Sequence, residues 1–270
     1  MDSINTEDLK KIQLDILKAV AKFCDDNNLT YYLTGGTLIG AVRHHGFIPW
    51  DDDIDVNMRR SDYKYFFEHF NNQNNNYQAI CIENNDKYYL ANGKVFDKRT
   101  VLVEDANNAI PIGVNIDIFP LDTFPGDLQL VGNTYKQVKK YQNILLVKTI
   151  KINQKRSLVK NGILFCGQII FKGVQPRVLL EKISSLSQKY NHLEDNRYIA
   201  AMSTMIYGMK EVFEISDFAS TVKLKFEDDY FTAPVGYDRV LRSVYGDYMQ
   251  LPPIEDQVTH HAYAAYWKKD

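Results

Sequence analysis

The chain has 270 residues, of which 45% are hydrophobic, 24% charged and 13% aromatic. This composition can bury a sizeable core, which excludes disordered, collagen-like and disulfide-stapled proteins, and the length fits one or two domains. Three widely spaced cysteines, Cys24, Cys81 and Cys166, exclude a disulfide framework. The polar N-terminus is unlike a signal peptide, and no apolar run reaches the roughly 18–20 residues that span a bilayer. We therefore expect a cytoplasmic protein.

Charge is unevenly distributed along the chain, although the net charge is only −2. Residues 131–190 contain twelve Lys or Arg and a single acidic residue, Glu181, so this basic block carries +11 and all other residues together carry −13. A block of this kind usually faces an anionic partner.

The predicted elements alternate between helix and strand up to about residue 127. Apolar residues at helical spacing predict a first helix over 9–23, with Ser3 and Thr6 as candidate N-caps. A β-rich run over 29–33 leads through a glycine pair into a short helix over 37–44. The remaining predicted elements are a strand over 51–58, a helix over 61–70, a pair of strands over 88–96 and 100–104, and a strand over 113–119 that ends at Pro120.

These patterns divide the chain into three regions. Residues 1–127 mix α and β patterns, residues 128–190 are helical and basic, and residues 191–270 are mixed and rich in Tyr. We expect an α+β protein with a mixed core, a helical basic insert and a mixed C-terminal part.

Two aspartates at alternating positions give the strongest chemical signal. Within a strand, Asp53 and Asp55 project from the same face while Ile54 and Val56 enter the core. Neighbouring carboxylates suit Mg²⁺, which takes one or two of them and completes its shell with water and substrate phosphate. A solvated acidic strand edge is the alternative, but four aspartates within five residues repel one another unless a cation offsets their charge.

A glycine pair and a third aspartate extend this pattern. Gly35 and Gly36 permit close approach of a phosphate between a strand and a helix, although a tight turn is the simpler interpretation. Asp117 shares a strand face with Asn115 and Phe119, and is either a plain strand residue or a third ligand for the same metal. A double glycine after a strand, an alternating aspartate pair on the next strand and a later Asp are typical of nucleotidyltransferase-fold enzymes.

The run from Gly35 to Val56, GGTLIGAVRHHGFIPWDDDIDV, resembles the hallmark of the LicD family of phosphocholine transferases, whose wider relatives include fukutin. Three further stretches look like that family: KVFD at 94–97, NIDIFPLD at 115–122, and YGDY at 245–248 followed by LPP at 251–253. The resemblance leaves out the basic block. It implies a nucleotidyltransferase-like mixed β-sheet core flanked by helices.

The resemblance also implies a reaction, in which phosphocholine moves from CDP-choline to a sugar hydroxyl of a cell-surface glycan, lipopolysaccharide or teichoic acid precursor and CMP is released. The acceptor is expected to be lipid-linked, and nucleic acid is not an expected partner. Mapped onto this chain, Asp53 and Asp55 hold Mg²⁺ or Mn²⁺ on the diphosphate, and Asp117 completes the metal site and orients or deprotonates the attacking hydroxyl. The residues implied to bind substrate phosphates and CMP are Gly35, Gly36, Thr37, Arg43 and Lys94.

Aromatic residues near these motifs are candidates for the choline head group. Trp50 and three C-terminal tyrosines, Tyr237, Tyr245 and Tyr248, are able to face a trimethylammonium group by cation–π attraction. A Trp after Pro is more often a core residue, however, and Arg43 is as readily paired with Asp51 or Asp52. Three alternatives to phosphocholine transfer also stay open: transfer of ribitol or glycerol phosphate from its CDP form, a nucleotidyltransferase that releases pyrophosphate, and a non-catalytic module that binds an anionic polymer.

A short apolar window lies inside the basic block. A helix that carries these residues next to lysines can lie in a membrane interface over anionic lipid, as a peripheral contact that cannot span. The alternative is that its apolar residues pack on the core while the lysines are solvated. The residues concerned are Ile163, Leu164, Phe165, Ile169, Ile170 and Phe171.

Overall fold

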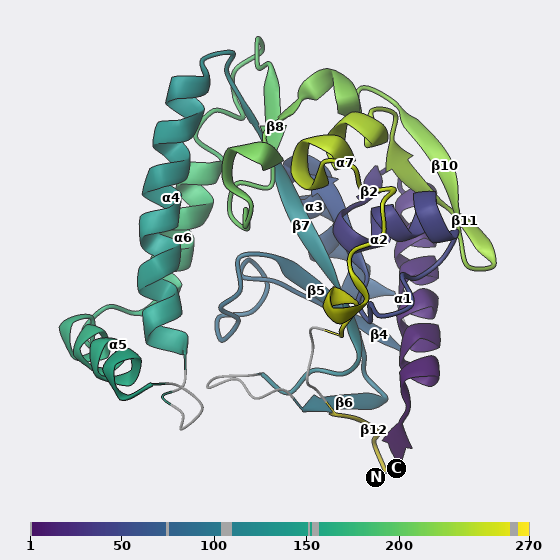
Figure 1. Cartoon of the computed structure of the whole chain (residues 1–270), viewed down its shortest axis with the longest axis horizontal. Helices are drawn as coiled ribbons and strands as arrows, with labels where there is room; N and C mark the ends of the chain where they lie inside the picture. Colours follow the sequence, from purple (N-terminus) through teal and green to yellow (C-terminus); the bar gives the residue numbers. More distant parts are fainter. Residues whose placement is uncertain are drawn as a thin grey trace.

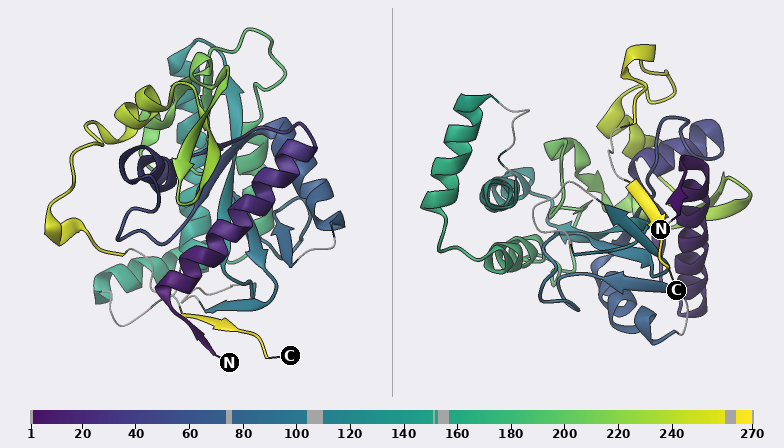
Figure 2. Two further views of the ribbon diagram at one scale, coloured as in Figure 1. Left: turned by 90° about the vertical axis from the view of Figure 1, so that its right-hand side faces the viewer. Right: turned by 90° about the horizontal axis from the view of Figure 1, so that it is seen from below.

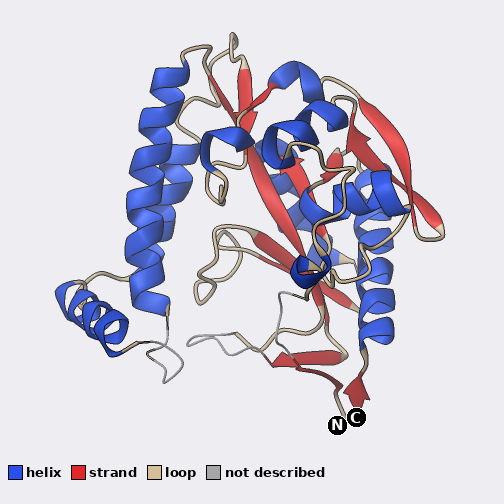
Figure 3. Ribbon diagram, in the orientation of Figure 1, coloured by secondary structure: helices blue, strands red, loops and turns tan. Residues whose placement is uncertain are grey.

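The computed structural model describes residues 2–73, 76–103, 110–150, 152, 157–259 and 264–269. Its centre is a mixed sheet in the order β2-β3-β7-β5-β4, which β8 and β9 extend beside β7 (Figure 1). The strands of this sheet are Tyr31–Leu33 (β2), Asp55–Arg59 (β3), Tyr77–Ile80 (β4), Gly93–Asp97 (β5), Asn115–Phe124 (β7), Tyr198–Ala200 (β8) and Phe213–Glu214 (β9). The predicted α+β class and mixed sheet are confirmed, and Figure 3 shows helices on the outside of the sheet.

The strands β3 and β7 are parallel, whereas the other neighbours in this sheet pair antiparallel. A parallel pair needs a long crossover connection, and here the crossover includes a helix. Besides β4 and β5, the chain between β3 and β7 forms Arg60–His69 (α3), Phe70–Asn72 (η2) and Thr100–Val103 (β6).

One face of the sheet is covered by α3 and by α1 (Thr6–Asp26). Apolar residues of β3 and β7 enter this layer, and Ile54 and Ile118 are fully buried. The two helices contact each other through Phe23 and Phe66, whose ring centroids are 5.3 Å apart. The predicted first helix is therefore confirmed, but its N-cap is Asn5, which accepts the backbone N–H of Asp8 at 2.8 Å, and not Ser3 or Thr6.

The opposite face of the sheet is polar near the starts of β3 and β7. Asp55 and Asn57 of β3 and Asn115 and Asp117 of β7 lie on it, because the residues that alternate with them enter the core. Lys94 of β5 lies on the same face, opposite Asp117. Asn57 is buried, however, whereas Asp55 and Asp117 are partly exposed, so the polar face opens to solvent around these two aspartates.

Several further elements lie outside the central sheet. A short segment after β2 forms α2 and η1, and α7 packs near it (Figure 1). A small antiparallel sheet in the order β1-β12-β6 brings the two ends of the described chain together. The bounds are Gly35–Ile39 (α2), Gly40–His44 (η1), Tyr237–Tyr245 (α7), Ser3–Ile4 (β1), Ala264–Trp267 (β12), Thr221–Phe226 (β10), Asp229–Pro234 (β11), Gly208–Glu211 (η3), Ile215–Phe218 (η4) and Ile254–Asp256 (η5).

The basic block is helical, as predicted. It contains α4 (Leu128–Thr149), α5 (Leu158–Ile170) and α6 (Pro176–Ser187), and α4 and α6 lie side by side along one edge of the molecule (Figures 1 and 2). Within the described residues, no helix is both long enough and apolar enough to cross a bilayer.

The predicted pairing of strands over 88–96 and 100–104 is wrong. The strand β5 begins only at Gly93 and pairs with β4 and β7, whereas β6 pairs with β12 near the C-terminus. Alternation of apolar residues identifies a strand and its buried face, but it does not identify the neighbouring strand.

The predicted end of a strand at Pro120 is also wrong, because β7 continues to Phe124. Asp117 donates its backbone N–H to the carbonyl of Ile54, just before β3, at 2.9 Å. Pro120 is three residues further on, so its backbone nitrogen points to the opposite side of β7. On that side the pairing with β5 ends at Ile118 and the pairing with β8 begins at Asp122. The missing N–H of proline therefore breaks no ladder bond.

Candidate functional site

Three charged residues predicted for the site form one row across the sheet. Asp55 of β3 is the register partner of Asp117 of β7, and Asp117 is in turn the register partner of Lys94 of β5. Residues at paired positions project to the same face, and their Cβ atoms typically lie about 5 Å apart. The parallel pairing of β3 with β7 thus brings together two carboxylates that lie 62 positions apart in the chain.

Asp117 is held by two donors on one of its oxygens. The Lys94 ammonium lies 2.6 Å from Oδ1, and the Asn92 side-chain amide donates to the same atom at 2.8 Å. Lys94 also donates to Oδ1 of Asn115 at 2.8 Å. The Asp117 side chain keeps 23% of its surface exposed, so it is oriented from one side and open from the other.

The glycine pair lies against Asp55 because β2 runs antiparallel to β3 and ends beside it. The backbone N–H of Thr34 donates to the carbonyl of Asp55 at 3.1 Å, and the N–H of Asp55 donates to the Thr37 hydroxyl at 2.9 Å. Gly35 has a positive φ of 57°, and a Cβ atom there would lie 3.2 Å from Oδ2 of Asp55. A Cβ at Gly36 would collide with Oδ2 of Asp51. Glycine is thus required for the close approach.

The predicted short helix starts earlier than expected. It begins at Gly35 as α2 and continues from Gly40 as the π-helical turn η1. Single π-helical turns occur mostly inside or next to α-helices, often at functional sites.

The acidic run before β3 is anchored by the first helix. The buried Gln13 of α1 donates its side-chain amide to the carbonyl of Asp52 at 2.9 Å and to that of Asn115 at 3.3 Å. Asp53 comes just before β3, which begins at Asp55, so the aspartate pair spans the start of the strand. Gln13 was not singled out from the sequence, because its position in a helix gives no sign of a contact 39 residues away.

Negative charge is concentrated around Asp55. Burial raises the pKa of this carboxyl well above its ordinary value, the charges of Asp53, Asp117 and Asp51 raise it further, and Lys94 opposes the shift. Like charges at this distance favour the neutral acid unless a cation is present.

A divalent cation fits this environment in part. Within the described ranges no three His, Cys, Asp or Glu side chains converge closely enough to ligate one ion. The second carboxylate of the row, Asp117, already contacts Lys94. Mg²⁺ commonly needs only one or two protein carboxylates, with substrate phosphate and water as its other ligands. The predicted strand over 51–58 begins only at Asp55, so Asp53 is not its neighbour on a strand face, and the metal site of Asp53, Asp55 and Asp117 stays a prediction.

Arg43 and Trp50 flank the acidic run. The Arg43 guanidinium donates to the carbonyls of Tyr248 at 2.6 Å and Gln250 at 3.3 Å, so it ties η1 to the C-terminal region. Trp50 is half-buried against the main core and makes an edge contact with the His44 ring at 6.3 Å.

The candidate aromatic residues lie in different environments. Tyr248 is 5% exposed, and its hydroxyl donates to Asp238 at 2.8 Å. Tyr245, three residues earlier, directs its hydroxyl toward the site, where it would lie 4.0 Å from a Cβ at Gly35. Burial of this hydroxyl raises the pKa of Tyr245, and the charge of Asp55 adds to the shift.

A second tyrosine and a glutamate accompany Tyr245. The ring of Tyr207 lies 5.6 Å from that of Tyr245 at 70°, and the two residues are 52% and 37% exposed. Glu211 accepts the backbone N–H groups of Ile206 and Tyr207, each at 2.7 Å. Sequence reasoning missed Tyr207 and Glu211, because they lie in a turn without periodicity.

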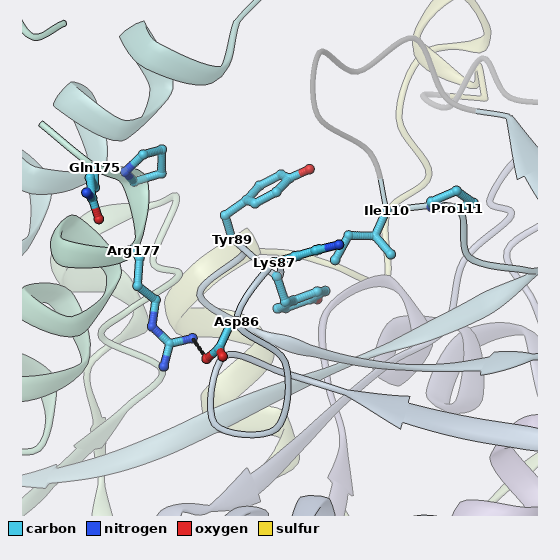
Figure 4. Close-up of a pocket in the computed structure, with 9 residues that line it drawn as sticks. Asp86, Lys87, Tyr89, Ile110, Pro111, Gln175 and Arg177 are labelled. Carbon is cyan, nitrogen blue, oxygen red and sulfur yellow. Dashed lines mark ion pairs between the residues drawn. The ribbon is translucent and has the colours of Figure 1, made fainter. Parts of the chain in front are cut away.

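A pocket lies apart from this cluster, where the basic helices meet the core. It has a volume of about 790 Å³, and Figure 4 shows Arg177 of α6 facing Asp86, with Tyr89 and Lys87 on the loop beside them. Arg177 also donates to the carbonyl of Ile82 at 2.5 Å, which ties α6 to the core. None of the residues predicted for the site lines this pocket.

Comparisons with known proteins support the family resemblance of residues 35–56. The family model described as "LicD/FKTN/FKRP, nucleotidyltransferase domain" matches residues 28–151. The lipopolysaccharide cholinephosphotransferase LicD of Haemophilus influenzae is 31% identical over 274 aligned residues, which cover 98% of this chain and 99% of that protein. An uncharacterized protein of Rickettsia typhi is 41% identical over 51 residues, 19% of this chain and 16% of its own. One of Rickettsia prowazekii is 35% identical over 69 residues, 22% of this chain and 26% of its own. Because the Haemophilus protein matches along nearly the whole length, this chain belongs to the LicD family.

Proposed function

We propose that this protein transfers phosphocholine from CDP-choline to a sugar hydroxyl of a lipid-linked cell-surface glycan precursor. The observation that carries the reaction class is the row of Asp55, Asp117 and Lys94 beside the glycine pair. The head group follows from the Haemophilus relative, which is a lipopolysaccharide cholinephosphotransferase. Phosphoryl transfer needs mainly positioning and charge stabilisation, which such a row supplies.

Asp117 is the proposed proton acceptor. The hydroxyl oxygen of the acceptor attacks the phosphorus that carries choline, the bond from this phosphorus to the oxygen of CMP breaks, and the hydroxyl proton passes to Asp117. Lys94 and Asn92 bind one carboxylate oxygen of Asp117 and so orient the other toward the hydroxyl. The Lys94 ammonium also lies where it offsets charge on the transferred group.

The donor diphosphate is proposed to lie against Gly35 and Gly36, where the backbone carries no side chain that would block it. Asp53 and Asp55 are the proposed ligands of Mg²⁺ or Mn²⁺, which supplies neutralisation of the diphosphate when bound. Removal of divalent cations with EDTA is expected to abolish transfer, and added Mg²⁺ or Mn²⁺ to restore it. Full activity in EDTA would contradict these assignments.

The choline head group is proposed to bind at Tyr207 and Tyr245. Both rings are partly exposed, and Tyr245 reaches the acidic cluster with its hydroxyl. Aromatic faces attract quaternary ammonium groups, and the nearby Glu211 carboxylate adds an opposite charge. This assignment replaces Trp50 and Tyr248, since Trp50 packs on the core and Tyr248 is buried.

A product assay tests the proposed reaction. The full chain is incubated with Mg²⁺, lipopolysaccharide that lacks phosphocholine, and either CDP-choline, CDP-ribitol, CDP-glycerol or CTP. We expect CMP and choline-labelled lipopolysaccharide from CDP-choline only. Release of pyrophosphate from CTP would indicate a nucleotidyltransferase, and preference for another CDP-alcohol would overturn the head group while leaving the reaction class.

A further inference from the structure

The helix α5 presents an apolar surface to solvent. Leu164 is its buried residue, whereas the side chains on the rest of the helix are largely exposed. The exposed apolar residues are Leu158 (88%), Val159 (73%), Ile163 (70%), Phe165 (54%), Ile169 (57%) and Ile170 (74%). With Gly162 and Cys166 they occupy roughly 160° of arc at about 100° per residue, and no charged residue falls within that arc. We call this surface the α5 outer face.

This arrangement is the reverse of an ordinary surface helix, whose apolar stripe faces the core. The opposite side of α5, which is mostly polar, is the side that contacts α4. Gln168 donates to the carbonyls of Val147 and Ile150 at 3.1 and 3.0 Å, and Lys148 donates to the carbonyl of Phe171 at 2.8 Å. Gly167 fits closely against Val147. These contacts fix α5 to the end of α4 with its apolar side outward.

The position of α5 leaves the outer face accessible. In Figure 1 and in the right-hand view of Figure 2, α5 projects beyond α4 at the edge of the molecule, away from the central sheet. The core-packing alternative for this window therefore fails for all of its residues except Leu164 and the half-buried Phe171.

The charged residues around α5 indicate which kind of surface the α5 outer face binds. Lys160 on the helix and Lys172 just after it are exposed beside the outer face. The segment 131–190 has twelve basic residues and one acidic one. Three of the twelve, Lys151, Lys155 and Arg156, lie outside the described residues and count here only by their charge. An apolar face with a rim of cations fits an anionic bilayer, which offers hydrocarbon and negative headgroups together.

We propose that α5 docks this protein on an anionic membrane, with the outer face inserted at the headgroup boundary and the flanking lysines over the headgroups. The 13-residue helix is about 20 Å long and lies in the plane of the interface. This docking is independent of the transfer reaction proposed above. It would hold the protein beside any substrate that is anchored in the same bilayer.

A second copy of this chain is the competing occupant of the outer face. Two such faces would bring two +11 segments together, which opposes pairing at low salt. The two occupants respond oppositely to salt, because screening weakens attraction to anionic lipid and relieves repulsion between copies.

Vesicle flotation of the full chain tests the proposal. We expect binding to phosphatidylglycerol vesicles at low salt, loss of binding near about 1 M salt, and no binding to phosphatidylcholine vesicles. The double variant F165S/I169S is expected to lower the bound fraction at least about tenfold. Ile254→Ser, which removes an even more exposed apolar side chain from another surface, should leave binding unchanged.

Charge variants separate the two parts of the interaction. Lys160→Glu with Lys172→Glu is expected to weaken binding severalfold, whereas Lys11→Glu on the exposed side of α1 should not. These side chains are exposed, so the circular dichroism spectrum should be unchanged in each variant.

Cys166 lies on the outer face and serves as a reporter. Burial raises the pKa of Cys24 and Cys81, the latter to about 12, so a thiol-reactive dye should label Cys166 alone. A polarity-sensitive dye there should shift to shorter wavelength with phosphatidylglycerol vesicles. No flotation of the wild type at low salt would overturn the proposal, and so would a dimer that F165S/I169S disperses.

Discussion

Two aspartates on the strand β7 are in opposite situations. Asp122 is fully buried and fully paired: Arg60 binds both of its oxygens at 2.9 and 2.6 Å, and Asn191 donates at 2.7 Å. Asp117, five residues earlier, has one oxygen held and a partly exposed side chain. Its neighbour Asp55 lies among an excess of negative charge.

The comparison separates a structural carboxylate from two that we propose to be functional. At Asp122 the positive and negative charges balance, so the protein alone satisfies the group. At Asp55 and Asp117 two or more carboxylates face one lysine, so the balance comes from a proton on Asp55 or from a bound cation. Mutation of Asp55 or Asp117 should therefore lower activity, whereas mutation of Asp122 should lower stability.

The largest expected effect is on turnover in Asp55→Asn. Loss of this carboxylate removes a proposed metal ligand and should lower kcat by about 10⁴-fold, on the order of 5 kcal/mol. Steady-state release of CMP from CDP-choline measures it. Turnover within tenfold of the wild type would contradict a catalytic role for Asp55.

The same variant should not be less stable. The raised pKa of Asp55 means that its charged form is disfavoured in the folded protein, so the neutral amide relieves repulsion at neutral pH. Without divalent cations, we expect an unchanged or higher Tm for Asp55→Asn. A lower Tm would show that the carboxylate is a structural group, like Asp122.

The second prediction concerns the balanced end of β7. Asp122→Ala leaves the Arg60 guanidinium buried without its partner and should lower the free energy of unfolding by about 3–5 kcal/mol. Urea denaturation measures this loss. The double variant R60M/D122L removes both charges and should recover most of it. If Asp122→Ala unfolds like the wild type, the pair is not structural.

Sequence reasoning predicted which residues of β3 and β7 enter the core better than it predicted how the strands are arranged. The alternation of Ile54, Val56 and Met58 correctly showed which residues enter the core, and it put Asp55 on the opposite face. It did not show that Asp117 would be in register with both Asp55 and Lys94, because register depends on neighbouring strands that are distant in sequence.

The aromatic residues show the same limit. Tyr245 and Tyr248 come from one short motif, yet one reaches the acidic cluster and the other is buried against Asp238. The direction of a side chain after a helix end depends on the turn geometry, which the motif does not specify. Likewise, the apolar composition of α5 gave no sign of whether its outer face meets the core.

The third prediction tests the close approach at the glycine pair. Gly35→Ala places a Cβ at positive φ and 3.2 Å from the Asp55 carboxylate, so it should cost about 1–2 kcal/mol of stability and lower kcat. Thermal unfolding and CMP release measure the two effects. The matched control is Gly173→Ala, where a Cβ would meet no atom within 4 Å. Equal behaviour of the two variants would contradict the need for glycine at position 35.

The smallest effect is expected at the proposed head-group site. Tyr245→Ala removes one aromatic face, and a cation–π contact of about 0.5–2 kcal/mol corresponds to roughly a twofold to thirtyfold rise in KM for CDP-choline. The change in kcat should be smaller, because choline is remote from the bond that breaks. Tyr248→Phe is the matched control: it keeps a buried ring, loses the bond to Asp238, and should leave KM unchanged.

Use of CDP-ethanolamine by Tyr245→Ala should be affected less than use of CDP-choline, since the exposed rings of Tyr207 and Tyr245 favour the methylated ammonium. If Tyr248→Phe raises KM and Tyr245→Ala does not, the head group binds on the other side of this turn.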